Sequence, residues 1–108
     1  MKNKHIDNVF NSLLLVKDTM PNFVYSNKWF NGKSGCIVSA YLLSKRLFSK
    51  NSLQNLETFE RLLSLSSFQA EAFLAGFDNS PKDSFKQKVI PYYELGNLFR
   101  MELMNDNN

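Results

Sequence analysis

The sequence predicts an all-α fold, built as one compact domain of five to six short helices. Apolar residues recur at spacings of three and four through most of the chain, and the breaks between these runs carry capping residues, prolines or glycines. A chain of 108 residues, of which 44% are hydrophobic, buries a core without disulfides or metal. We therefore expect a single helical domain over residues 1–108, with residues 1–5 and 105–108 frayed.

The first helix is expected at about residues 6–20. Its apolar residues fall at helical spacing, Asp7 lies in its first turn, and Met20-Pro21 ends it. Residues 22–32 read as a loop in which Phe23-Val24-Tyr25 is a short extended piece. Ser34 is predicted to cap a second helix, which ends with cations at Lys45-Arg46, where they suit the helix dipole.

The second half of the chain has clearer helix signals. A break at residues 50–52 precedes a third helix that reaches Leu65, and Ser66 with Gln69 resembles a capping box that opens a fourth helix. Ser80-Pro81 predicts a short helix to about Val89, and Pro91 opens the last one. The core is predicted to contain six large side chains: Leu13, Ile37, Leu56, Leu63, Phe73 and Phe99.

Two glycines lie among aromatic residues at or near helices, in the stretches FLAGF and YELGNLF. Glycine in such a position permits close approach of helices or caps a helix end. We interpret Gly76 and Gly96 as packing residues rather than functional ones.

Catalytic and cofactor motifs are missing from the sequence. Gly32-Lys33-Ser34 matches the end of a phosphate-binding loop, but Asn27 stands where that loop needs its first glycine. The only histidine, His5, is expected at an exposed N-terminus, and Cys36 is expected to be structural, because no oriented base accompanies it. One Cys and one His also make no zinc ligand set. We expect no enzymatic activity, no cofactor and no bound metal.

Charge is distributed unevenly along the chain. Residues 1–50 carry eight Lys and Arg against two Asp, whereas residues 51–108 carry five against eight acidic residues. The basic half contains the predicted partner-binding residues, which are Lys28, Trp29, Phe30, Lys33, Lys45 and Arg46. Cations beside stackable rings suit single-stranded nucleic acid, and they equally suit a protein interface. Whether Trp29 and Phe30 are exposed or fold back on the core remains open.

The stretch from Glu57 to Phe77 resembles a helix-turn-helix in outline, because two amphipathic helices flank a short turn. Glu60 replaces the usual small residue, and Ser64 replaces the usual glycine of the turn. The second helix of the pair contains Gln69 and Glu71 but no Lys or Arg, which major-groove readers use on phosphates and bases.

These observations favour a small non-enzymatic regulatory or inhibitory protein that docks on a protein or nucleoprotein partner. The alternative is a nucleic-acid-binding regulator that uses the basic N-terminal half or the degenerate helix-turn-helix at residues 57–77. No segment is long and apolar enough to span a bilayer, and a single Cys fits a reducing compartment, so a cytoplasmic protein is expected. The sequence leaves open whether the protein forms a homodimer. The Asn- and Lys-rich composition is typical of AT-rich genes and favours a low-GC bacterium, a plasmid or a phage as the source, so the protein is one that a phage or mobile element could encode.

Overall fold

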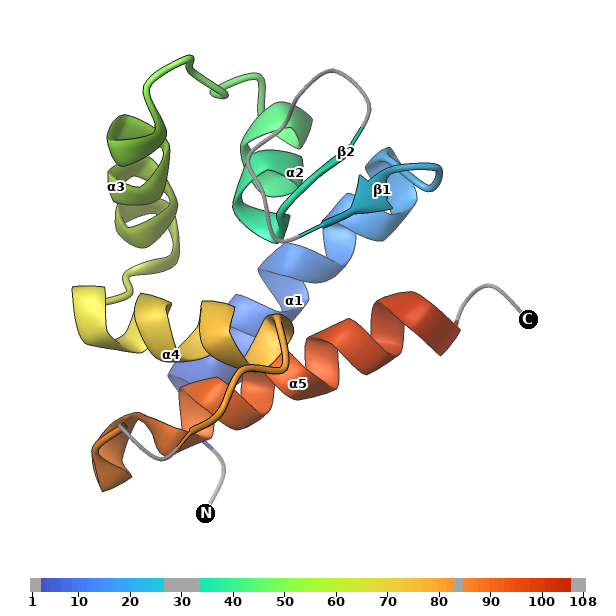
Figure 1. Ribbon diagram of the computed structural model, residues 1–108. Helices are drawn as coiled ribbons and strands as arrows, with labels where there is room; N and C mark the ends of the chain where they lie inside the picture. The colour runs from blue at the N-terminus through green and yellow to red at the C-terminus, as the bar shows by residue number, and fades with distance from the viewer. Residues whose placement is uncertain (1–2, 27–33, 83–84, 106–108) are drawn as a thin grey trace. The chain divides into compact units, whose positions relative to one another are not determined.

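The computed structural model describes residues 3–26, 34–82 and 85–105 and confirms the all-α class (Figure 1). Within those residues the chain forms five α-helices, one 3-10 turn and two strands of two residues each. The elements in chain order are α1 (Lys4–Thr19), β1 (Val24–Tyr25), β2 (Ser34–Gly35), α2 (Ile37–Ser44), α3 (Ser52–Leu63), α4 (Ser67–Phe77), the 3-10 turn η1 (Gln87–Val89) and α5 (Ile90–Asn105).

Two compact units make up the chain, and each is described by itself. Unit 1 comprises residues 1–10 and 65–108, and unit 2 comprises residues 11–64. Helix α1 therefore contributes its first turns to unit 1 and its remainder to unit 2. Folding of residues 1–108 as a single domain stays a prediction.

Unit 1 is organised around the contact between α4 and α5, whose backbones meet at two glycines. A Cβ atom at Gly76 would lie 1.9 Å from the carbonyl oxygen of Tyr93, and one at Gly96 would lie 2.1 Å from that of Phe73. Real Cβ atoms do not approach backbone so closely, so only glycine allows the two helices to come this near. The predicted packing role of both glycines is confirmed.

Aromatic rings fill the space beside this contact. Phe99 of α5 is fully buried, and its ring centroid lies 6.5 Å from that of Phe73 and 6.2 Å from that of Phe77. Phe10 of α1 meets Phe99 edge to face at 5.9 Å. The guanidinium of Arg100 donates to the carbonyl oxygen of Phe77 at 2.7 Å, which satisfies one of the last carbonyls of α4.

Unit 2 packs α2 against α3, with the small parallel sheet beside α2. The rings of Tyr41 and Phe59 meet edge to face, with centroids 5.7 Å apart, and both side chains are buried. In the sheet, Val24 pairs with Ser34 and Tyr25 with Gly35. Burial raises the pKa of the Tyr25 phenol to about 12. The short extended piece predicted around residues 23–25 is therefore present.

The start of the second helix differs from the prediction. Residues 34 and 35 pair with β1 as strand β2, and the helix begins only at Ile37, with Cys36 as its N-cap residue. Ser34 is therefore not the cap. Strand pairing places the backbone of Ser34 in an extended conformation three residues before the first helical turn.

The helix predicted from Ser80 to about Val89 is also wrong for the described residues, because only η1 forms there. Asn79 has φ 59°, and the backbone N–H of Ser80 donates to the carbonyl oxygen of Ala75 at 2.8 Å. This bond completes a C-terminal Schellman motif of α4. The hydroxyl of Tyr93 also donates to the carbonyl oxygen of Ser80. Ser80 therefore ends α4 instead of starting another helix.

Two further helix starts, those of α3 and α4, are capped by side chains. The side chain of Asn51 accepts a hydrogen bond from the backbone N–H of Gln54 at the start of α3. The capping box between Ser66 and Gln69 has both of its hydrogen bonds, so that prediction is confirmed. These caps fix where α3 and α4 begin.

Five of the six predicted core side chains are buried, namely Leu13, Ile37, Leu63, Phe73 and Phe99. Leu56 is only half-buried, so the prediction is wrong there. The inward position on this part of α3 belongs to its neighbour Asn55, which is 2% exposed and hydrogen-bonds to the backbone of Ser49. A polar side chain with local backbone partners thus takes the place that hydrophobicity assigned to leucine.

Candidate functional site

Lys45 and Arg46 are the two predicted partner-binding residues that the structure describes, and both are exposed just after α2. The other four, which are Lys28, Trp29, Phe30 and Lys33, lie outside the described residues, so their role stays a prediction. The candidate site is therefore built from unit 2 around Lys45 and Arg46.

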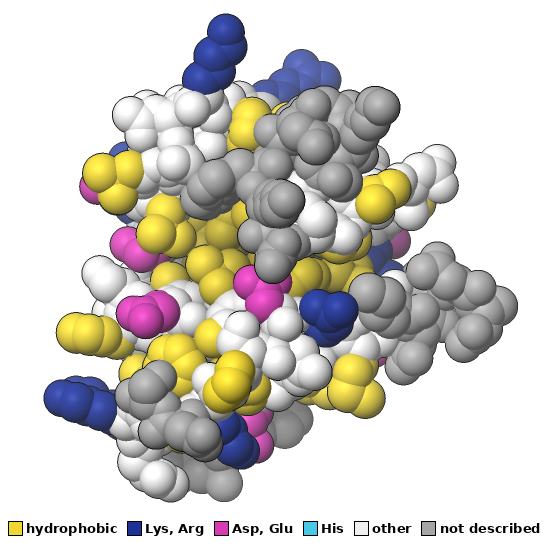
Figure 2. Space-filling model, viewed as in Figure 1, with side chains coloured by type: hydrophobic (Ala, Val, Ile, Leu, Met, Phe, Trp, Pro, Cys, Tyr) yellow, Lys and Arg dark blue, Asp and Glu magenta, His cyan; other side chains and the backbone are white. Residues whose placement is uncertain are grey.

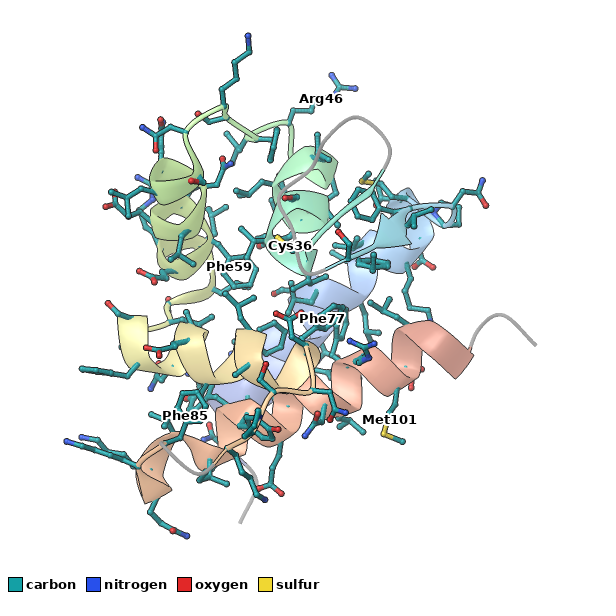
Figure 3. The ribbon with its side chains drawn as sticks, in the orientation of Figure 1. Cys36, Arg46, Phe59, Phe77, Phe85 and Met101 are labelled. Atoms are coloured by element: carbon teal, nitrogen blue, oxygen red, sulfur yellow. The ribbon has the colours of Figure 1, made fainter. Side chains whose placement is uncertain are left out.

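Helix α2 ends in a Schellman motif that fixes the direction of the chain at Arg46. The N–H of Leu47 donates to the carbonyl oxygen of Leu42 at 2.8 Å, and the N–H of Arg46 donates to that of Leu43 at 3.1 Å. Arg46 has φ 60°, a left-handed conformation that glycine usually supplies at this position. An L-residue held there costs roughly 1–2 kcal/mol. Figure 3 shows the Arg46 side chain projecting away from the helices of unit 2.

The buried side-chain amide of Asn55 makes two hydrogen bonds to the loop between α2 and α3. Its Oδ1 atom accepts from the N–H of Ser49 at 2.8 Å, and its Nδ2 atom donates to the carbonyl oxygen of Ser49 at 2.9 Å. The N–H of Asn51 donates to the hydroxyl of Ser49 at 3.0 Å. Both ends of this loop are thus hydrogen-bonded to α2 or α3. These bonds fix the backbone conformation from which the exposed side chains project.

Exposed cations and exposed leucines are interspersed on this frame. Lys45, Arg46 and Lys50 are exposed, while Leu47 and Leu53 remain 47% and 65% exposed. We call these five residues the basic-leucine corner. Figure 2 shows basic side chains projecting from this end of unit 2, with hydrophobic side chains close by. The sequence from residue 19 to residue 56 contains no Asp or Glu, so the corner is positively charged.

Tyr41 supports the corner from inside the unit. The ammonium of Lys45 lies 5.3 Å from the centroid of the Tyr41 ring, within the range of a cation–π contact. The ring itself is 3% exposed, and burial raises the pKa of its hydroxyl. Tyr41 therefore positions Lys45 and does not offer a ring face to a ligand.

His5 and Cys36 both lie in contexts that the sequence did not indicate. His5 is half-buried in α1 of unit 1, and its Nδ1 atom lies 2.7 Å from the hydroxyl of Tyr92, so the expectation of an exposed His5 is wrong. Cys36 is half-buried, with its Sγ atom 3.4 Å from the hydroxyl of Ser39. Among the described residues, no cluster of three or more His, Cys, Asp or Glu is placed to hold a metal ion.

The helices of the helix-turn-helix resemblance are present, as α3 and α4. Ser64, which stands where a turn glycine is usual, adopts φ 54° and thus takes the conformation that glycine supplies. Phe68 and Glu71 are exposed on α4. Recognition of DNA by this element stays a prediction.

A second surface feature, in unit 1, was not anticipated from the sequence. A hollow of about 280 Å³ lies between α4 and the segment that leads into η1. It is lined by Phe68, Glu71, Phe85, Lys86, Lys88 and Val89. In Figure 3 the labelled Phe85 lies below α4, on the side of this segment. The sequence predicted a helix over residues 80–89. That prediction gave no indication of a hollow beside α4.

Comparison with protein-family models, with curated proteins and with solved structures found no significant match for this chain. Within the described part of the chain, no helix combines the length and the apolar character needed to cross a bilayer.

Proposed function

We propose that the protein is a non-enzymatic regulatory or inhibitory binding protein that docks on an acidic, partly apolar surface of another protein through the basic-leucine corner. The observation that carries the proposal is the exposure of Leu47 and Leu53 among three cations on a hydrogen-bonded frame. A rigid frame lowers the entropy lost on binding, and arginine is enriched among the residues that dominate interface energetics.

The two leucines favour a protein partner over a nucleic acid. Binding to phosphates needs cations, and binding to single strands adds aromatic stacking. Leu47 and Leu53 supply neither of these, whereas they gain free energy when an apolar partner surface covers them. Of the two aromatic residues that flank Lys45 in sequence, Tyr41 is buried and Phe48 is half-buried.

The non-enzymatic part of the proposal rests on the sequence. A nucleophile needs an oriented base, and the chain has one Cys and one His. In the structure the Nδ1 atom of His5 lies next to the Tyr92 hydroxyl, and Sγ of Cys36 lies next to the Ser39 hydroxyl. The expectation of no catalysis thus rests on the lack of a recognisable Cys–His motif in the sequence.

Leu53→Ser tests the proposal by affinity capture from a nuclease-treated lysate of the source organism. Leu53 is 65% exposed, so the substitution leaves the fold intact within ~0.5 kcal/mol. Loss of an apolar anchor is expected to reduce retention of the captured protein by about tenfold, which corresponds to ~1.4 kcal/mol.

Lys82→Glu provides the matched control, because Lys82 is an exposed cation of unit 1 and lies outside the corner. It is expected to retain the partner as the unmodified protein does. Equal retention by Leu53→Ser would contradict the proposal. Loss of all bound protein after nuclease treatment would instead support the nucleic-acid alternative, whose affinity should fall steeply with salt.

A further inference from the structure

The hollow of unit 1 combines apolar walls with a net positive rim. Among its lining residues, Phe68 is 72% exposed, Phe85 is half-buried and Val89 is buried. Lys86 and Lys88 are exposed around it and outnumber Glu71, the one acid among the lining residues that the structure describes. An apolar side chain flanked by carboxylates complements such a site, because burial favours the former and charge favours the latter.

Helix α5 of the same unit carries a surface with that chemistry. Residues 91, 94, 98, 101 and 102 are all exposed, and their spacing of three and four places them on one face of the helix. We call Glu94, Leu98, Met101 and Glu102 the α5 stripe. Leu98 is 53% exposed and Met101 is 58% exposed, with one acid on either side of them in sequence. Figure 3 shows Met101 on the side of α5 away from α4.

We propose that the protein self-associates, with the hollow of one copy receiving the α5 stripe of a second copy. Leu98 and Met101 then contact Phe68 and the hollow, while the acids of the stripe lie near Lys86 and Lys88. Because every copy carries both surfaces, a two-fold dimer forms two such contacts and leaves neither surface open.

The exposed apolar side chains of unit 1 support the inference that the hollow and the α5 stripe belong to one interface. Among its described residues, the large hydrophobic side chains that remain exposed are Phe68, Leu98 and Met101. All three belong to the hollow or to the stripe, so the dimer covers the whole set. The inference goes beyond the proposed function, since it uses no residue of the basic-leucine corner.

Sedimentation velocity of the full chain tests the proposal over a concentration series up to on the order of 100 µM, because dimerisation depends on protein concentration. The unmodified protein is expected to shift from monomer to dimer. Phe68→Ser should raise the dissociation constant by at least about tenfold, since it removes the apolar anchor of the hollow. Leu15→Ser, an equally apolar and 58% exposed position of unit 2, is the matched control and should leave the dimer unchanged.

Charge reversal then identifies the contact. The pair Lys86→Glu/Lys88→Glu and the pair Glu94→Lys/Glu102→Lys should each give monomers, because like charges then face each other. A mixture of the two variant proteins should restore the dimer, since both of its contacts again join opposite charges. Circular dichroism checks that every variant is folded. A monomeric unmodified protein at all concentrations, a dimer that survives either reversal, or a mixture that stays monomeric overturns the proposal.

Discussion

Gly96→Ala is expected to destabilise the protein by about 3 kcal/mol, the upper end of the usual cost of overpacking, although alanine is the better helix former. In an open helix this substitution gains up to about 1 kcal/mol from helix propensity. Here the new Cβ would lie 2.1 Å from the carbonyl oxygen of Phe73 and 2.7 Å from the backbone nitrogen of Phe77. Neither atom belongs to a flexible side chain, so α4 and α5 must separate and lose their packing.

Urea unfolding followed by circular dichroism measures the effect. Glu94→Ala is the control on the same helix, because Glu94 is exposed and its loss should change stability by less than ~0.5 kcal/mol. Measurement at low protein concentration keeps self-association out of the comparison. A Gly96→Ala protein at least as stable as the unmodified one would show that the helices do not meet at this residue.

Phe99→Ala is expected to cost about 3–5 kcal/mol, the range for loss of a buried phenylalanine. Phe99 is fully buried, and its ring meets those of Phe10, Phe73 and Phe77 at centroid distances between 5.9 and 6.5 Å. Removal of the Phe99 ring leaves a cavity between its three neighbouring rings. The two packed helices cannot easily move together to fill it.

The same unfolding experiment distinguishes a stability loss due to burial from one due to the mere removal of a large apolar side chain. Leu15→Ala also shortens a large apolar side chain, but Leu15 is 58% exposed, so its loss should cost less than ~1 kcal/mol. Similar losses for Phe99→Ala and Leu15→Ala would contradict the core that the structure describes.

The helical class and most helix bounds could be predicted because their causes are local. The spacing of Val9, Leu13 and Val16 gives the buried face of α1, and the capping box of Ser66 with Gln69 starts α4. Ser80-Pro81 is an equally good local signal, yet it fails. There the end of α4 and the hydroxyl of Tyr93 both bond to Ser80, and the contact with Tyr93 of α5 is not visible in the local sequence.

The candidate site was predictable only in part. The cations Lys45 and Arg46 at the end of α2 follow from the preference of helix C-termini for positive charge. The left-handed conformation of Arg46 does not, because glycine or asparagine normally signals it. The exposure of Leu47 and Leu53 could not be predicted, because it depends on which faces of α2 and α3 pack together. The hydrophobic pattern also placed Leu56 in the core, where the structure has Asn55. The hollow depends on contacts between α4 and η1.

Arg46→Gly gives the most direct test of docking through the basic-leucine corner, because its two effects have opposite signs. Glycine suits the left-handed position, so the free energy of unfolding should rise by about 0.5–1 kcal/mol. Loss of the guanidinium should weaken binding to the captured partner by at least about tenfold. Arg46→Ala should weaken binding equally without the gain in stability. A more stable Arg46→Gly protein that binds its partner as tightly as the unmodified protein would contradict the account.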